Sequence, residues 1–589
     1  MPGLSVIDGR GSLPPDAVDA AFDAVRFDDD YARETLYDGD EVLVGWTGYP
    51  AYPGDRLKTD RWHLFLDGAL YDRSLDDDGE RVADWLAAGD DDELASWLRS
   101  RDGAFVLVAV DRATEETHVL TDAFARLPTY RASIRGADVV SRELALVGTL
   151  ARETGTDRPV DRLGVAQTLL FGYRLGDRTL YKGVSHLPPA ARVRLGGARE
   201  RVFRYDFGTR TRADRSVREN ARRLARQFAV ACENRARGGP VVVSLSGGLD
   251  SRAAAAGYAT LDVPTRAATF DPITSDASGE LRVAERVARA VGLPWKRYRV
   301  TSRAEHEAWL VETMQGMNSV GMAPVVDFLD ALVDDHGRGV TLVTGDGGDK
   351  ALPDLTPPRS FGDLDALVDH LVAAHAVMTP ADAAAAAGVD EDALVASVAE
   401  RIRSYPESAP GDRYAHFAVR ERAVNWLNHG EDRNRYFCWS ASPFYAAPFF
   451  LDAMNCPPEQ KRRGRLYRAF LRQLSPGIER IEHADFGASP DSVEYALKRF
   501  VYEQSGRYPR LKEALLGTVR SRAPSEETVR RLRTTLATDE RVTDVLSADA
   551  VGRALDAERV PDIAAYDLLT IAAVAGRSAP LVPTTETGT

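Results

Sequence analysis

The chain has 589 residues, 44% of them hydrophobic, and a formal net charge of −14. This length exceeds what one hydrophobic core supports, so we expect two or three domains. The acidity argues against nucleic acid as a partner. No apolar run approaches the roughly 20 residues of a membrane span, and no signal-peptide core is present, so we expect a cytoplasmic protein without a membrane partner.

Two further features of the composition set limits. The only cysteines, Cys232, Cys438 and Cys456, are too few and too scattered for a disulfide framework or a zinc site. Acidic clusters recur, and lysine is scarce beside arginine. This balance is typical of proteins from extreme halophiles, with GC-rich codon usage as the simpler explanation.

Short strand-like runs separated by turns fill residues 1–207. They lie at 41–45, 62–66, 104–110, 117–120 and 191–195. Recurring short strands predict a sheet-layered α+β domain.

A charged amphipathic helix at 214–237 opens the second expected domain, 208–577. Strand-like runs at 241–244, 265–270, 295–300 and 340–344 alternate with helical segments at 252–259, 280–291, 303–317 and 324–336. This alternation predicts an α/β fold with a doubly wound parallel sheet, in which ligands bind at the carboxyl ends of strands. Beyond residue 350 the pattern is mostly helical, with a helical insert near 360–405, and residues 578–589 have the composition of a flexible tail.

The strongest motif follows the strand at 241–244. It reads Ser246-Gly247-Gly248-Leu249-Asp250-Ser251 and leads into an alanine-rich helix. Glycine amides approach an oxyanion closely, and a helix N-terminus adds partial positive charge. Asp250 would repel phosphate unless a divalent cation bridges the two. The hexapeptide lacks the lysine of a Walker motif and predicts a site for ATP and Mg²⁺; the simpler alternative is an ordinary glycine turn.

A second glycine-and-acid motif follows the strand at 340–344, reading Thr344-Gly345-Asp346-Gly347-Gly348-Asp349. Because both motifs follow parallel strands, we expect them to meet at one nucleotide site. Asp250 and Asp349 are the candidate Mg²⁺ ligands, since Mg²⁺ prefers a few carboxylates together with phosphate oxygens. Thr269, Thr344 and Gly345 are candidates to line the nucleoside.

The first motif resembles the PP-loop of the N-type ATP pyrophosphatases, and the chain as a whole resembles the asparagine synthetase superfamily. Thr344–Asp349 resembles that family's second motif. The segments 102–105, 120–130 and 179–190 resemble its N-terminal class II glutamine amidotransferase domain, and 442–452 resembles its Val-Pro-Phe-Leu-Asp element. The resemblance implies an Ntn-type N-terminal domain followed by a PP-loop ATP pyrophosphatase domain.

Departures from that family shape the expected function. The family's glutaminase uses an N-terminal cysteine, whereas no cysteine precedes Cys232 here. The family's Asn-Gly-Glu-Ile-Tyr-Asn is Asp67-Gly-Ala-Leu-Tyr-Asp72, and an aspartate cannot donate a hydrogen bond to an oxyanion. We therefore expect an inactive amidotransferase-like domain in a divergent member.

The synthetase half departs as well. Asp346 replaces the family glutamate and is the candidate to orient or deprotonate an incoming amine; a turn residue is the alternative. Lys350 replaces an acidic residue. The family lysine that stabilises the phosphorus transition state is absent from 480–486, so its role is assigned to Arg480, with His483 and the arginines of 460–465 as alternatives. Aromatic residues at 436–445 are either acceptor-pocket lining or core.

Three functions remain open. The first is an ATP-dependent, AMP-forming ligase that joins a small-molecule or peptide carboxylate to an amine whose nitrogen does not come from glutamine. The second is an ammonia-dependent asparagine synthetase, and the third is a nucleotide-binding pseudoenzyme or scaffold. We expect ATP and Mg²⁺ as cofactors, and a homodimer is possible.

Overall fold

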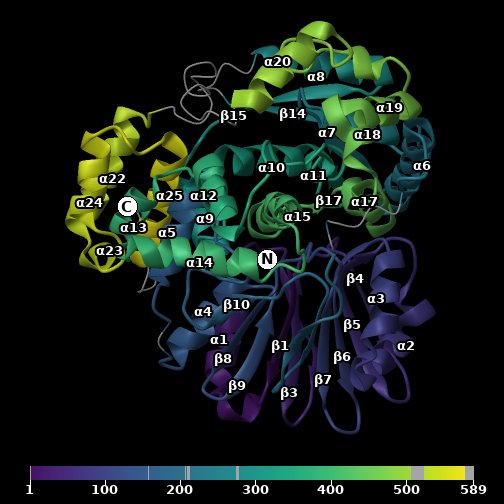
Figure 1. Cartoon of the computed structure of the whole chain (residues 1–589). Helices are drawn as coiled ribbons and strands as arrows, with labels where there is room; N and C mark the ends of the chain where they lie inside the picture. Colours follow the sequence, from purple (N-terminus) through teal and green to yellow (C-terminus); the bar gives the residue numbers. More distant parts are fainter. Residues whose placement is uncertain are drawn as a thin grey trace, which may run out of the picture.

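Two antiparallel six-stranded sheets dominate the N-terminal part of the computed structural model, which describes residues 2–156, 158–205, 207, 212–272, 278–505 and 523–576 (Figure 1). The first has the order β10-β8-β9-β1-β3-β2, with β1 Gly3–Asp8, β2 Ala32–Asp38, β3 Val42–Gly48, β8 Tyr130–Ile134, β9 Ala137–Ser141 and β10 Val184–His186. The second has the order β12-β11-β7-β6-β5-β4, with β4 Gly54–Lys58, β5 Trp62–Leu70, β6 Gly103–Asp111, β7 Thr117–Thr121, β11 Ala191–Arg194 and β12 Arg199–Arg201.

These sheets stack face to face with helices on both outer sides. Alternation along β6 shows why, since Val106 and Val108 join the core with the first sheet, whereas Phe105 and Leu107 pack toward α2 (Leu75–Ala88) and α3 (Asp91–Ser100). On the far side, α1 (Pro15–Asp23) packs with α4 (Leu144–Glu153). The sheet-layered α+β prediction is confirmed.

A five-stranded parallel sheet forms the centre of the next part, in the order β15-β14-β13-β16-β17. The long helix α6 Val217–Ala236 precedes this sheet in the chain. The strands of the sheet are β13 Val241–Ser244, β14 Thr265–Pro272, β15 Trp295–Val300, β16 Thr341–Val343 and β17 Trp439–Ala441. Helices α7 (Leu249–Tyr258) and α8 (Ser278–Val291) cover one face. Helix α10 (Ala323–His336) covers the other, and α9 spans Ala304–Met314. The doubly wound prediction is confirmed.

Strand order places the site within this sheet. From β13 the chain proceeds to β14 and β15 on one side, and later to β16 and β17 on the other. The carboxyl ends of β13 and β16 therefore flank the switch point, where a crevice opens in such sheets. Both glycine-and-acid motifs begin there.

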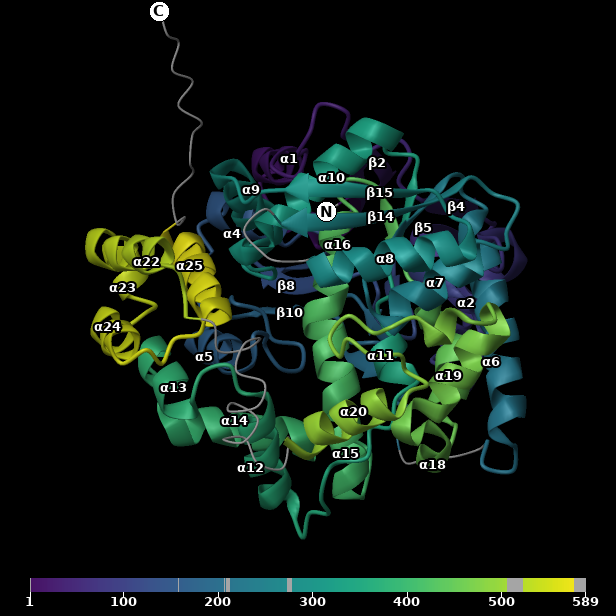
Figure 2. The same cartoon turned by 90° about the horizontal axis from the view of Figure 1, so that it is seen from above.

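The remainder of the chain is largely helical, as predicted. The first group is α11 Gly348–Ala351, α12 Leu364–His375, α13 Pro380–Ala387, α14 Glu391–Arg403, α15 Pro410–His416, the π-helical turns Phe417–Glu421 and Ala423–Leu427, and α16 Asn428–Asn434. The second group is α17 Ala447–Met454, α18 Pro458–Lys461, α19 Arg465–Leu474, α20 Val493–Ser505, α22 Glu526–Thr538, α23 Glu540–Thr543, α24 Ala548–Asp556 and α25 Asp562–Gly576. Figure 2 shows α22–α25 beside α5 (Arg162–Phe171) and α13, with which they share a core.

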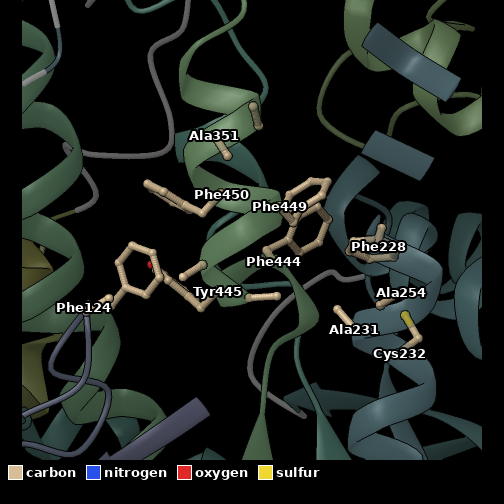
Figure 3. Close-up of a cluster of buried hydrophobic side chains, with 14 of the residues drawn as sticks. Phe124, Phe228, Ala231, Cys232, Ala254, Ala351, Phe444, Tyr445, Phe449 and Phe450 are labelled. Carbon is tan, nitrogen blue, oxygen red and sulfur yellow. The ribbon is translucent and has the colours of Figure 1, made fainter. Parts of the chain in front are cut away.

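The aromatic segment after β17 belongs to the core rather than to an acceptor pocket. Phe444 and Phe449 pack against Phe228 of α6, and Tyr445 and Phe450 pack against Phe124 of the N-terminal part (Figure 3). This cluster joins the two parts of the chain beneath the second motif.

The division at residue 207 stays a prediction, and the predicted tail at 578–589 lies outside the described residues. Within the described part of the chain, no helix is both long and apolar enough to cross a bilayer.

Candidate functional site

The PP-loop turns sharply between β13 and α7 and is closed by its own serines. The Ser246 amide donates to Ser251 Oγ at 3.0 Å, and the Gly248 amide donates to Ser246 Oγ at 3.2 Å. The two hydroxyl oxygens lie 2.9 Å apart. Helix α7 begins at Leu249, so its N-terminal amides and partial positive charge lie at this loop.

Glycines of the second motif allow its loop to touch the PP-loop backbone. A Cβ on Gly345 would lie 2.6 Å from the Ser251 amide nitrogen, and one on Gly348 would lie 2.7 Å from Asp250 Cγ. Gly347 has φ 98°, in the left-handed region that favours glycine. Three glycines within four residues are thus explained by close approach and by backbone conformation.

This contact brings the two predicted metal ligands together. The Asp349 amide donates to Asp250 Oδ2 at 2.8 Å, and the Tyr467 hydroxyl donates to Asp250 Oδ1. Burial, reinforced by the neighbouring Asp349 carboxylate, raises the pKa of Asp250 to about 7. Lys350 donates to Asp349 Oδ2 at 2.6 Å.

Two close carboxylates, of which Asp250 has a raised pKa, fit a divalent cation, because a cation would relieve their repulsion. Within the described ranges, no group of three or more histidine, cysteine or acidic side chains is placed to hold a metal. The protein therefore offers Mg²⁺ two carboxylates, which leaves the remaining positions for phosphate oxygens and water.

A cavity of about 480 Å³ opens over these loops. The predicted site residues that line it are Ser246, Asp250, Ser251, Thr344, Gly345, Asp346 and Asp349. Residues from both motifs thus share one space.

The other predicted residues lie elsewhere. Gly247, Gly248 and Leu249 belong to the turn, and Leu249 is buried in the core. Thr269 donates its hydroxyl to the Leu245 carbonyl at 2.6 Å, which holds the end of β14 rather than the cavity wall. The side chain of Arg480 is 73% exposed and lies beside Glu479, so the structure does not place it in the cavity.

Asp346 faces the cavity from the second motif. Burial raises the pKa of its carboxyl, and the Arg126 and Arg433 guanidiniums partly oppose that rise. Ser442 Oγ fixes the loop by donating to the Asp346 carbonyl at 2.6 Å. A carboxylate whose pKa is moved toward neutrality is suited to proton transfer.

Sequence reasoning missed the opposite wall of the cavity. Its polar part comprises Asn318, Arg422, Arg433 and Asn434, and its apolar part comprises Phe270, Met322, Val325, Phe328, Trp426 and Leu427. Arg433 donates to Asn318 Oδ1 at 3.1 Å, and burial lowers its pKa to about 10. No local motif distinguishes these side chains from other helical residues; only the fold brings them to the site.

The segment at 478–484 packs against the PP-loop and overlaps the stretch 480–486 considered for the family lysine, and the side chain of Arg480 within it is exposed. Arg252 of α7 is fully buried and donates to the carbonyls of Ile481 at 2.7 Å and Glu482 at 2.8 Å. The Ala484 amide donates to the Gly247 carbonyl at 3.3 Å. A Cβ on Gly247 would lie 2.3 Å from Ala484 Cβ, which explains this glycine.

In the N-terminal part, the aspartate that replaces the family asparagine is engaged in a buried ion pair. Arg142 Nε donates to Asp67 Oδ2 at 3.0 Å, and its NH2 donates to Asp432 Oδ1 of α16 at 2.6 Å. All three side chains are essentially inaccessible to solvent. A Cβ on Gly3 would lie 2.5 Å from Asp67 Oδ2, so the pair fills the space beside the start of β1.

Comparison with known proteins supports the synthetase assignment. Residues 223–352, which contain both motifs, match the family model of asparagine synthase. These residues form an asparagine synthase domain. The family comprises ATP-dependent amidation ligases in general, so this domain is ligase-like. No curated protein matches the chain.

Two solved structures are similar to parts of the chain at low levels. One is the allosteric regulatory enzyme of purine biosynthesis, with 13% identity, TM-score 0.21, and coverage of 51% of this chain and 80% of that one. The other is glutamine phosphoribosylpyrophosphate amidotransferase from B. subtilis complexed with ADP and GMP, with 12% identity, TM-score 0.22, and coverage of 60% and 83%. Likeness at this level carries no argument about the ligands or the activity of this chain.

Proposed function

We propose that the chain is an ATP-dependent ligase that activates a carboxylate as an acyl-adenylate and passes it to an amine supplied by a source other than glutamine. One observation carries this proposal: Asp250 and Asp349 meet at the mouths of adjacent parallel strands, within one cavity of about 480 Å³. The cavity has the size of a small-molecule site.

In the first step, a carboxylate oxygen of the substrate attacks the α-phosphorus of ATP, and pyrophosphate leaves. The PP-loop amides and the hydroxyls of Ser246 and Ser251 would hold the departing pyrophosphate. Asp250 and Asp349 would hold Mg²⁺, which neutralises phosphate charge when bound. Thr344 and Gly345 would line the nucleoside.

In the second step, the amine attacks the acyl carbon, the C–N bond forms, and AMP leaves with the oxygen that came from the carboxylate. Asp346 would accept the proton that the amine loses, because its carboxylate faces the cavity with a raised pKa. Negative charge develops on the acyl oxygen during this attack. Arg433, which is buried beside Asp346, would lie near that charge.

Two features support an amine that this chain does not release from glutamine. The first cysteine in the sequence is Cys232, and all three cysteines are buried. Burial raises the pKa of each thiol, which disfavours the nucleophilic thiolate. Asp67, where the family donates a hydrogen bond to an oxyanion, is an acceptor paired with Arg142. The three unpaired thiols also fit a cytoplasmic protein.

The test has two readouts. Candidate carboxylates are screened for ATP–pyrophosphate exchange, and carboxylate labelled with ¹⁸O is then followed into AMP. Exchange together with one ¹⁸O in AMP supports the adenylate. The proposal is overturned if the label appears in phosphate instead, or if no carboxylate supports exchange although ATP still binds. Aspartate-dependent AMP release with ammonium alone would identify an asparagine synthetase.

The nitrogen source is tested separately. Glutamine should give no glutamate and no product above the level without it, whereas the correct amine should release AMP. Glutamate formed in proportion to AMP would contradict the proposed inactivity of the N-terminal domain.

A further inference from the structure

A second, smaller pocket lies where the N-terminal sheets meet the helical run of α15, the π-helical turns and α16. Its volume is about 20 Å³, room for about one water-sized occupant. It is lined by Gly176, His186, Pro188, Pro189, Arg201, Phe203, Arg204, Tyr205, Arg401, His416, Arg420, Glu421, Val424 and Asn425. None of these residues lines the nucleotide cavity, although Arg422 of the same helical run does.

Positive charge dominates this pocket. Four guanidiniums line it, from Arg201, Arg204, Arg401 and Arg420, against a single carboxylate, that of Glu421. These residues come from separate elements: Arg420 from a π-helical turn, Arg401 from α14, and Arg201 from the end of β12.

Glu421 is already fully engaged. Its carboxylate accepts from Arg401 Nε at 2.7 Å, from the Tyr405 hydroxyl at 2.9 Å and from the Gly176 amide at 2.8 Å. Its charge is thus matched to Arg401, leaving the other three guanidiniums in excess.

The partners of those three differ: Arg420 lies over the Phe124 ring and is acted on by the Glu407 and Asp122 carboxylates, whereas Arg201 and Arg204 have fewer partners. Arg204 donates to the Ser404 carbonyl at 3.2 Å, and Arg420 donates to the Ala123 carbonyl at 3.3 Å. Among the residues that the structure describes, no side-chain hydrogen bond or ion pair of Arg201 is present. Burial and the neighbouring Arg401, Arg204 and Arg420 lower the pKa of Arg201 to about 9.

Two further carboxylates near the pocket belong to the described part of the chain, and both have other partners. Glu407 accepts from His416 Nδ1 at 3.0 Å and from the Phe207 amide at 3.1 Å, and its charge also acts on Arg420. Asp177 is ion-paired with Arg199. Among the lining residues that the structure describes, guanidiniums outnumber carboxylates, with Arg204 exposed and Arg201 and Arg420 partly buried, and an anion would offset this positive charge.

We propose that this pocket is a binding site for one small monovalent anion, with chloride as its ordinary occupant. The volume suits a monatomic ion, whereas a phosphate group is larger than a single water. The guanidinium N–H groups and the positive excess supply the recognition chemistry. This proposal is independent of the ligase proposal, because it uses none of the cavity residues.

The test replaces chloride with gluconate at constant sodium concentration and follows thermal unfolding of the full chain. Chloride should raise Tm in a saturable way by about 2–5 °C, as a ligand that binds only the folded state does. Crystals grown or soaked in sodium bromide should show an anomalous peak in contact with Arg201.

The variant Arg201→Gln separates binding from a structural role. It should remove the chloride-dependent rise while leaving Tm in gluconate equal to or above that of the wild type, because it removes one of the crowded charges. Arg194→Gln, which removes an exposed arginine from the adjacent strand β11, should keep the full chloride effect.

The proposal is overturned if there is no bromide peak in the pocket, if Tm is indifferent to chloride, or if Arg201→Gln shows the same chloride effect. Greater stabilisation by phosphate than by chloride would also overturn it, since it would identify a larger oxoanion as the ligand.

Discussion

Replacing Asp250 by asparagine should have opposite effects on stability and on chemistry. In the unliganded protein, Asp250 is forced beside Asp349, and burial together with that carboxylate raises its pKa from 3.8 to about 7. Asparagine keeps the shape of the side chain and removes the charge. Its carbonyl oxygen can accept the hydrogen bond of the Asp349 amide, and its NH2 group can donate to the Tyr467 hydroxyl oxygen, which reverses the direction of the second hydrogen bond.

The magnitude follows from linkage. A carboxyl whose pKa is higher in the folded state loses stability as pH rises, starting near the unfolded value of about 4 and ending near the folded value of about 7. The full difference between the folded and unfolded pKa values of Asp250 corresponds to about 4 kcal/mol. Solvent in the open cavity screens part of that energy, so we expect about 2 kcal/mol.

The assay is chemical unfolding of wild type and Asp250→Asn with EDTA and without nucleotide, at several pH values between 5 and 8.5. The variant should be more stable by about 2 kcal/mol at pH 8, and the difference should shrink as pH falls toward 5. ATP–pyrophosphate exchange should fall below detection in the same variant, because one metal carboxylate is lost.

Asp262→Asn, on an exposed turn after α7, is the matched control and should change neither readout. The reasoning is refuted if Asp250→Asn is less stable than the wild type at pH 8 while folded, if its stability advantage does not depend on pH, or if it retains full exchange.

Three further changes test other parts of the site. Gly345→Ala places a methyl group 2.6 Å from a PP-loop amide; it should cost about 1–3 kcal/mol in urea unfolding and abolish exchange, whereas Gly339→Ala, with nothing within 4 Å, should do neither. Arg142→Gln leaves the buried Asp67 without its cation and Asp432 with only the more distant Arg435, and it should cost about 3–5 kcal/mol. The control Arg152→Gln, which removes an exposed ion pair with Glu153, should cause no measurable loss. Asp346→Asn should leave exchange near the wild-type rate and slow product formation about 10²–10⁴-fold in single-turnover assays; equal losses in both would exclude its role as base.

Local sequence patterns predicted the parallel sheet and its two loops well. A run of valines at 241–243 followed by a glycine turn predicts a buried strand entering a helix, and the second motif repeats this arrangement. Because β13 and β16 are neighbours, the motifs meet as expected, and Asp250 and Asp349 lie in contact.

Other parts of the site depend on contacts between distant segments and have no local signal. Arg433 reaches the cavity because α16 packs beside β17, and Arg142 meets Asp67 and Asp432 across 75 and 290 residues of sequence. The candidacy of Arg480 rested on the resemblance to the asparagine synthetase superfamily, whose lysine is absent from 480–486. The resemblance located the segment at 478–484 beside the PP-loop but could not indicate the direction of one side chain.

The buried Arg252 has a consequence for the order in which the site is completed during synthesis. Its guanidinium donates hydrogen bonds to main-chain carbonyls about 230 residues further along the chain, at Ile478, Ile481 and Glu482. A ribosome-bound chain that has emerged only as far as α16 already contains both motifs, yet the cover over Gly247 has not been made. Such long-range closure is slow relative to local folding. Nucleotide affinity should therefore arise late, as a property of the nearly finished polypeptide.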